Sequence, residues 1–394
     1  MYRLYKHFLS LFFFSSCFFA EVSPGVILFS NTRNFGGSET LLINNKKEII
    51  NVWRHDIPTI GIPYLGRDGT LILQFKPYDH TFFIDHGPLG GIFQKLDWGG
   101  KLLWQFNFYN DQFMPHHDFE ILPNGNILIL GWEKKSYLDA LEVGRVNIEN
   151  EFWPLAIYEI KPIGSDSASI VWSWHIWDHL VQDIDPFLEN YGVINENVDK
   201  IDVNISESSG PDWLHTNSIA YNPYLDHIIF SSRNLNEVFI IDHSTTTEQA
   251  ASSTGGNSGK GGRIIYRWGN PLNYNRGTVN DQILRGQHGV YWIENDFIGA
   301  GELLIFNNNP TDTIGPTGLF GNSSIIQFKP ELDINGNYFI NNFDIYGPHD
   351  YNLVYGGDNS FFSNFQSGAY RMKNGNTFVT VTQQKIMFEI DTLN

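Results

Sequence analysis

Three histidines, His117, His215 and His288, occupy the same position in a repeated local pattern. Each lies eight residues before a turn position, and the same spacing recurs from Gly61 and from Ser367. We call the position of a residue within its repeat its phase. If the repeated units surround a common axis, residues of equal phase lie at equal height along that axis and at equal distance from it. The three imidazoles, far apart in the chain, would then converge. Convergent imidazoles suit nucleophilic chemistry, proton transfer or metal binding.

Arg233 is predicted to lie beside His215. A strand runs from His215 to a turn at residues 222–223, and the returning strand ends at Arg233. A guanidinium next to imidazoles makes an anion site, because its planar donors match the oxygens of sulfate or phosphate. Asn217, two residues after His215 on the same strand face, would add an amide donor. The alternative interpretation is that Arg233 pairs with a surface carboxylate.

Ser367 and His116 complete the candidates for substrate binding, together with Asn217. Ser367 shares the phase of the three histidines. His116 adjoins His117 but has the opposite strand direction, so we expect it to point away from the axis or to support the site from behind. The histidines outside the repeat phase are expected to be structural: His55, His80, His86, His175, His179, His227, His243 and His349.

A metal site is the alternative use of three imidazoles, which suit zinc, copper or iron. A cationic Arg233 in the same pocket is unfavourable for a dication. No carboxylate shares the histidine phase, and Asp118 is expected to alternate to the other face of its strand. We therefore expect neither a metal nor another cofactor. A metal-dependent hydrolase or lyase remains the alternative.

The elements that position these residues are predicted to be short strands. Apolar runs separated by turn residues, with no sustained helical periodicity, predict an all-β protein. A third-strand pattern of an aromatic with an acid or amide recurs at residues 92–97, 157–160, 238–242, 325–328 and 386–391. A fourth-strand pattern with tryptophan recurs at residues 52–53, 103–106, 171–174 and 265–268. Six four-stranded units predict a six-bladed β-propeller over residues 24–394.

The ends of the array are irregular. The last unit stops at Asn394 after its third strand. Either the last blade is short, or strands from the N-terminal segment close the ring. Two long insertions, residues 178–212 and 244–262, are expected to be loops on one face.

The chain begins with residues that resemble an export signal. A basic start precedes an apolar stretch at residues 8–14, too short to span a bilayer, so residues 1–20 are predicted to be a signal peptide. Cys17, the single cysteine, follows in a sequence like a bacterial lipoprotein cleavage box. We expect an exported protein, in the periplasm or at the cell surface, with either lipid attachment through Cys17 or plain secretion.

The net charge of the chain restricts the kinds of partner that it can bind. The formal net charge of −18 repels phosphate backbones, and no basic stripe is present, so nucleic-acid binding is not expected. The oligomeric state is left open by the sequence.

Several motifs resemble the arylsulfotransferase family of bacterial exported proteins, the aryl-sulfate sulfotransferases. They are the sequences at residues 116–119, 212–217, 231–233, 241–246, 267–271, 286–288, 367–369 and 374–377. The resemblance covers most of the chain after the signal. It implies a six-bladed propeller that moves a sulfuryl group from an aryl sulfate donor to a phenolic acceptor, without metal and without the nucleotide sulfate donor PAPS, through a sulfated histidine.

The resemblance also implies residue roles. His288, in the Gln-His motif, would be the nucleophile, and His117, His215, Asn217 and Arg233 would surround the sulfuryl oxygens. His215 or His117 would act as the general acid, and the choice stays open.

The chain departs from the family pattern in several places. It lacks the extra N-terminal domain and the disulfide of the best-known members. Gly289 follows the nucleophile where many relatives carry Asp, and the last blade ends early.

Two further questions stay open: which aromatic residues contact an aryl ring, and whether the protein is an enzyme. Trp213 and Tyr291 or Trp292 are expected either to stack on an aryl ring or to be buried in the blades. The alternative to an enzyme is a propeller that binds a sulfated or carboxylated ligand without turning it over.

Overall fold

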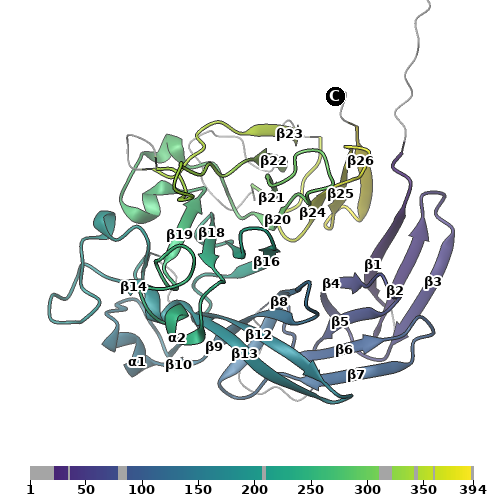
Figure 1. Ribbon diagram of the computed structural model, residues 1–394, viewed down its shortest axis with the longest axis horizontal. Coiled ribbons are helices and arrows are strands. Elements are labelled where there is room, and N and C mark those ends of the chain that lie inside the picture. Colours follow the sequence, from purple (N-terminus) through teal and green to yellow (C-terminus); the bar gives the residue numbers. More distant parts are fainter. Residues whose placement is uncertain are drawn as a thin grey trace, which may run out of the picture.

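The computed structural model describes residues 22–33, 36–78, 87–205, 210–309, 322–340, 345–357 and 360–391. Six antiparallel sheets are arranged around a central axis, and the chain passes from one sheet to the next in sequence order (Figure 1). The protein is a six-bladed β-propeller, as predicted. The predicted signal and Cys17 lie outside the described residues, as do His80 and His86.

The four central blades have four strands each. The second blade contains β4 (Thr59–Leu65), β5 (Leu71–Phe75), β6 (Ile92–Leu96) and β7 (Leu102–Asn107), and the third contains β8 (Phe113–Ile121), β9 (Ile127–Glu133), β12 (Leu155–Ile163) and β13 (Ser167–His175). The fourth contains β16 (Thr216–Asn222), β17 (His227–Ser232), β18 (Glu237–Asp242) and β19 (Ile264–Trp268), and the fifth contains β20 (His288–Trp292), β21 (Leu303–Asn307), β22 (Ser324–Phe328) and β23 (Asn352–Gly356).

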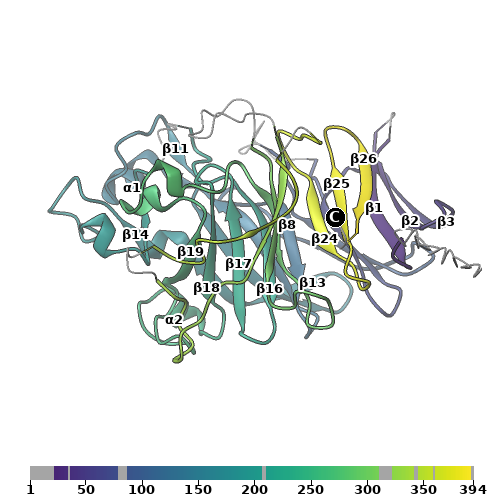
Figure 2. The ribbon, with the colours of Figure 1, turned by 90° about the horizontal axis from the view of Figure 1, so that it is seen from above.

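The first and last blades have three strands each in the described part of the chain. The first contains β1 (Val26–Thr32), β2 (Ser38–Asn44) and β3 (Ile49–His55), and the sixth contains β24 (Gly368–Arg371), β25 (Thr377–Val381) and β26 (Ile386–Ile390). The last blade is therefore short, the first of the two outcomes predicted. Figure 2 shows β24–β26 and β1 side by side at the same end of the molecule.

Tryptophans on the outermost strands join neighbouring blades; Trp53, predicted on a fourth strand, lies on β3, the third strand of the first blade. The indole N–H groups of Trp53, Trp104, Trp174 and Trp268 each donate to a backbone carbonyl of the next blade or its connection: those of Asp97, Ser167, Gly262 and Pro348, at 3.1, 2.8, 2.7 and 2.8 Å. A buried indole needs such an acceptor, so each tryptophan both fills the space between two sheets and fixes their relative position. This contact explains why the fourth-strand pattern repeats. The fourth strand of the fifth blade, β23, lacks tryptophan and was not predicted.

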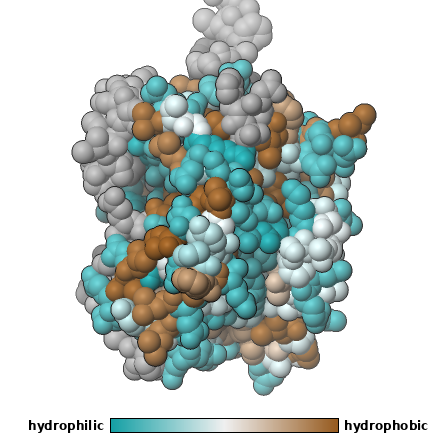
Figure 3. Space-filling model, turned by 90° about the vertical axis from the view of Figure 1, so that its left-hand side faces the viewer, coloured by the Kyte–Doolittle hydropathy of each residue, from teal (hydrophilic) through white to brown (hydrophobic). Residues whose placement is uncertain are grey.

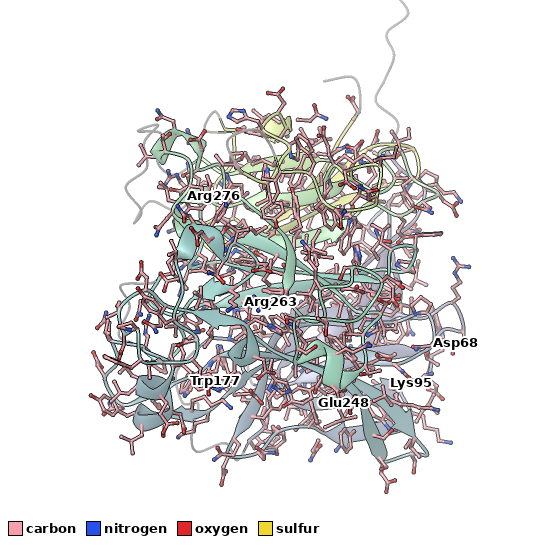
Figure 4. The ribbon with its side chains drawn as sticks, turned by 60° about the vertical axis from the view of Figure 1, so that its left-hand side comes forward. Asp68, Lys95, Trp177, Glu248, Arg263 and Arg276 are labelled. Atoms are coloured by element: carbon pink, nitrogen blue, oxygen red, sulfur yellow. The ribbon has the colours of Figure 1, made fainter. Side chains whose placement is uncertain are left out.

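The long insertions fold onto the blades. Residues 176–205 contain η1 (Ile176–His179), β14 (Leu180–Val181), η2 (Ile194–Glu196) and β15 (Ile201–Asp202), and residues 244–262 contain α2 (Thr247–Ala250). Arg263 pairs with Asp199 at 3.3 Å, and the guanidinium of Arg276 donates to the carbonyl of Asn195. Figure 4 labels both arginines. These contacts hold the first insertion against the fourth blade.

The remaining elements are short. They are β10 (Lys135–Ser136), α1 (Tyr137–Glu142), β11 (Glu151–Phe152), η3 (Pro271–Tyr274) and η4 (Val279–Asp281). Figure 3 faces the side that carries α1 and β14 and shows hydrophobic residues interspersed with hydrophilic ones. In the described part of the chain, no helix combines the length and apolar character needed to cross a membrane.

Candidate functional site

The inner strands of five blades are kinked at corresponding places. His117, His215 and Ser367 have positive φ angles of 55°, 46° and 80°, and Gly61 and Gly289 have 71° and 61°. Positive φ is uncommon for residues with a side chain and often marks functional sites. The shared phase therefore corresponds to a real backbone feature. In the fifth blade the residue with the positive φ is Gly289, so His288 lies one residue before the kink.

The kinks bring the predicted histidines together. The rings of His117 and His215 meet edge to face, with centroids 4.7 Å apart. His117 and His288 line one cavity of about 620 Å³, together with Asn217 and Ser367. Residues from the third, fourth, fifth and sixth blades thus converge near the axis.

His288 is held in a defined orientation. Its Nδ1 lies 3.0 Å from the carbonyl oxygen of Gly286 and 2.8 Å from Oδ1 of Asn308. The Asn308 amide is itself oriented, because its nitrogen donates to the carbonyls of Ser363 and Gln366 at 2.9 and 3.0 Å. Both atoms facing Nδ1 are therefore acceptors, so Nδ1 carries the proton and Nε2 keeps its lone pair. Burial is the main cause that lowers the pKa of His288 to about 3.

His215 is paired with a buried carboxylate. Its Nδ1 lies 2.6 Å from Oδ2 of Asp212, while Oδ1 of Asp212 accepts from the indole of Trp132 at 3.0 Å and from the His215 backbone N–H at 3.1 Å. Burial alone would raise the pKa of Asp212, but the hydrogen bond and charge of His215 outweigh it and hold that pKa below its ordinary value. Asp212 therefore stays ionised and stabilises a positive charge on His215.

His117 is supported from behind by His116. The two Nδ1 atoms are 2.8 Å apart, so one ring donates and the other accepts. The His116 ring stacks on Trp132, with centroids 4.0 Å apart, and is fully buried. Burial lowers the pKa of His116 to about 3, and burial followed by the charge of His215 lowers that of His117 well below its ordinary value. Both rings are neutral at neutral pH. Their arrangement fits the supporting position expected for His116 rather than direct substrate contact.

Arg233 lies next to His215, where the hairpin argument predicts it. Its backbone N–H donates to the His215 carbonyl at 3.1 Å. Its charge contributes to lowering the pKa of both His117 and His288, although burial is the larger cause at each. Among the described residues it forms no ion pair with a carboxylate. Its guanidinium donates one long hydrogen bond, of 3.5 Å, to Oδ1 of Asn234, and its other N–H groups are suited to an anion.

Asn217 lies at the cavity, and one of its two amide N–H groups already has a partner. Its nitrogen donates to the Gln287 carbonyl at 2.7 Å, while its buried Oδ1 has no partner. One N–H and one acceptor oxygen remain for a ligand. The hydroxyl of Ser367 accepts from the Thr382 backbone N–H at 3.0 Å.

Asp118 lines the same cavity as His117, against the expected alternation. Because His117 has a left-handed backbone, consecutive side chains do not point to opposite faces there. Oδ2 of Asp118 accepts from the backbone N–H of Ile219 at 3.1 Å, and burial raises the pKa of Asp118 to about 7.

Trp213 does not reach the cavity. It is fully buried in the apolar cluster between the third and fourth blades, the second of the two outcomes expected for it. The Tyr291 hydroxyl bonds to the backbone of Arg371.

Within the described ranges, no group of three or more His, Asp or Glu side chains is arranged to hold a metal ion.

Three residues of the site were not predicted from the sequence: Asp212, Asn308 and Asp118. Asp212 stands three residues before His215, within a motif already noted. Asn308 follows β21, which returns from His288, just as Arg233 follows the strand returning from His215. The same hairpin argument therefore identifies Asn308, whereas Asp118 depends on a kink that the sequence does not reveal.

Comparisons with solved structures find low similarity over most of the chain. A protein of unknown function from Bacteroides caccae is 11% identical, with 94% of this chain and 91% of that chain covered and a TM-score of 0.47. The Dos1 propeller is 10% identical, with 92% and 65% covered and a TM-score of 0.40. Regucalcin, a calcium-binding protein from Agrobacterium tumefaciens, is 8% identical, with 94% and 93% covered and a TM-score of 0.40. Comparison with curated proteins gave no match.

A family model gives the decisive comparison. The model described as Arylsulfotransferase (ASST) matches residues 67–387, which include the site residues His116, His117, Asp118, Asp212, His215, Arg233 and His288. This membership supports aryl sulfotransferase activity on small aryl sulfate and phenol substrates. The chain belongs to the arylsulfotransferase family.

Proposed function

We propose that the protein transfers a sulfuryl group from an aryl sulfate to a phenol through a sulfated His288, independently of PAPS. The observation that carries this proposal is the hydrogen bonding of His288. Because Nδ1 faces two acceptors, Nε2 is the free nucleophile in a cavity shared with His117 and Asn217.

In the first half-reaction, Nε2 of His288 attacks the sulfur of the donor. The new N–S bond forms as the S–O(aryl) bond breaks, and the bonding electrons go to the departing phenolate oxygen. That oxygen takes a proton from Nε2 of His215. His215 suits this role better than His117, because the Asp212 carboxylate stabilises its charged form while burial keeps His117 neutral.

The second half-reaction reverses these steps with a different phenol. The acceptor hydroxyl gives its proton to Nε2 of His215 as its oxygen attacks sulfur, and the N–S bond breaks with its electrons returning to His288. The guanidinium of Arg233, which donates only a long hydrogen bond to Asn234 among the described side chains, and the remaining N–H of Asn217 are suited to the sulfuryl oxygens. His117 can donate to the same oxygens when it accepts from His116 at Nδ1, because its Nε2 then carries the proton.

The test is sulfuryl loading by donor alone. Wild-type protein mixed with para-nitrophenyl sulfate should gain the mass of one SO₃ group on the peptide that contains His288, and steady-state kinetics should be ping-pong. His288→Ala should lose the loading and at least about 10³-fold in transfer. His349→Ala, at a histidine far more exposed, is the control and should behave as wild type.

Two results would count against the proposal. Loading retained in His288→Ala would remove His288 from the nucleophilic role. An unmodified wild-type protein that binds the donor without releasing nitrophenolate would indicate a binding module.

For localisation, we propose export with residues 1–20 as the signal. Mass analysis of the mature N-terminus distinguishes cleavage before a lipidated Cys17 from plain secretion.

A further inference from the structure

The seam between the sixth and first blades differs from the other five seams. Each of those five contains a cluster of buried apolar residues contributed by both neighbouring blades. Between the sixth and first blades, the described residues instead line the outer part of the cavity of about 620 Å³, whose inner part reaches the histidines near the axis. A hydrogen bond of 2.7 Å from the Ser23 backbone N–H to the Glu389 side chain connects the two blades at this seam.

One face of the sixth sheet forms a wall of this cavity. Along β25, Val379 is buried against the fifth blade, whereas Phe378 and Thr380 line the cavity. Their partners across the sheet, Tyr370 and Met387, line it as well. Strand alternation therefore places two aromatic rings and a thioether on this wall.

The opposite wall is the edge strand of the first blade. All residues of β1 line the cavity, including Ile27 and Phe29. Aromatic, aliphatic and thioether groups thus face one another across the seam. Such a surface favours a flat aromatic ligand, which contacts rings and sulfur with little loss of its own conformational freedom.

The cavity continues to the proposed nucleophile. His117, Asn217 and His288 line the same space as Phe378 and Thr380. A ligand lying in the seam can therefore present an oxygen at its inner end to His288. Beyond the histidines, Asp118 is the one ionisable carboxyl group of the lining, so the walls do not favour a highly charged polymer.

The volume indicates the size of the ligand. A cavity of about 150 Å³ is sufficient for benzene. The whole cavity, at about 620 Å³ from the seam to His288, is roughly four times as large and lies within the range of small-molecule sites. A single-ring phenol would leave most of it unfilled.

We infer that the seam between the sixth and first blades is the aryl-binding site for phenols of two or more fused rings, with the reacting oxygen directed to His288. This inference rests on the proposed function for the identity of the reaction. Its new content is the place where the rings bind and the preference for polycyclic substrates.

The test fills the seam with a side chain. Thr380→Trp places an indole on the cavity wall, and Ser167→Trp places the same group at an exposed position of β13. Two measurements apply to the full chain: the ratio of kcat/KM for naphthol over phenol as acceptor, and the equilibrium binding of a phenanthrol by calorimetry. Thr380→Trp should lower the ratio and the phenanthrol affinity each by at least about tenfold, and Ser167→Trp should change neither.

Failure of this inference differs from failure of the proposed function. If sulfuryl loading of His288 is normal but Thr380→Trp leaves both the ratio and phenanthrol binding unchanged, the aryl site lies elsewhere. The same conclusion follows if the wild-type full chain binds no phenanthrol. If loading never occurs but phenanthrol binds and Thr380→Trp weakens it, the aryl site stands and the sulfohistidine proposal fails.

Discussion

At the scale of single residues, the site combines two histidines whose Nδ1 atoms have different partners, neutral acceptors at His288 and a carboxylate at His215. Burial keeps His288 neutral, with a pKa lowered to about 3, and Asn308 and Gly286 fix which nitrogen is free. At His215, by contrast, an ionised Asp212 stabilises the imidazolium. The proposed nucleophile and the proposed general acid can thus differ in chemistry within one site because their neighbours differ.

Asp212→Asn tests the general acid. The Oδ1 position accepts from two N–H groups, so the amide nitrogen of Asn would face Nδ1 of His215. Nδ1 would then have to accept, and the charged ring would lose its counterion. We expect donor cleavage to fall about 10²-fold for phenyl sulfate, whose phenolate needs a proton, and far less for para-nitrophenyl sulfate.

The leaving-group dependence separates this role from a structural one. Asp226→Asn alters a carboxylate–histidine pair away from the site. It should not lower the cleavage rate of phenyl sulfate relative to that of para-nitrophenyl sulfate. An equal loss for both donors in Asp212→Asn would mean that Asp212 only maintains the fold.

At the scale of elements, contacts between neighbouring blades recur with different chemistry. Tryptophans on the outermost strands bond to the next blade or its connection at four places. Between the third and fourth blades, His243 also bonds to Glu159 at 2.9 Å and to Asp226 at 2.8 Å. Glu159 belongs to β12, and its hydrogen bond thus connects two blades through a titratable group.

The His243 contact predicts a pH-dependent stability. Burial lowers the pKa of His243, but its two carboxylate partners outweigh this and raise it above the ordinary 6.5, so its contribution is lost as pH rises through the raised pKa. Burial raises the pKa of Glu159, but hydrogen bonds led by that of His243 hold it below 4.5, so its contribution is lost as pH falls through the lowered pKa. The contact should therefore stabilise the folded protein most between pH 4.5 and pH 6.5, the ordinary pKa values of the two groups.

Urea unfolding across pH 4 to 9 measures this contribution. His243→Gln should lose about 2 kcal/mol of unfolding free energy near pH 6 and less at higher pH. His349→Gln, at a histidine with an exposed side chain, is the matched control. A loss in His243→Gln that is constant from pH 5 to 9 would show that the ion pairing contributes nothing.

At the scale of the whole molecule, the ring is packed at five seams and open at the sixth. The first and last blades each lack a fourth strand in the described part of the chain, and the cavity replaces the apolar cluster between them. The opening costs buried apolar area but provides space beside His288. Stability and substrate access are therefore opposed at this seam.

Hydrogen exchange should reveal the difference between seams. Backbone amides of β24–β26 are expected to exchange at least about tenfold faster than those of β16–β19, because local opening there breaks fewer apolar contacts. A bound phenanthrol should slow exchange in β25 while leaving β17 unchanged. Uniform protection around the ring would mean that the seam is as tightly packed as the others.

Much of the fold could be predicted from the sequence because the repeat pattern is local. The third-strand pattern located β6, β12, β18, β22 and β26, and the tryptophans located β3, β7, β13 and β19. The strand β23 was missed because it lacks the tryptophan. The hairpin argument placed Arg233 beside His215 because strand pairing converts spacing along the chain into proximity.

The sequence by itself determined the blade count, the candidate histidines and the family, since these depend on periodicity and motifs along the chain. The tertiary structure alone decided which nitrogen of His288 is free, that Asp118 joins the cavity, and that the last seam is open. Those properties depend on atoms from different blades and on backbone kinks at single residues. Such contacts exist only when the ring is assembled, so spacing in the chain carries no signal for them.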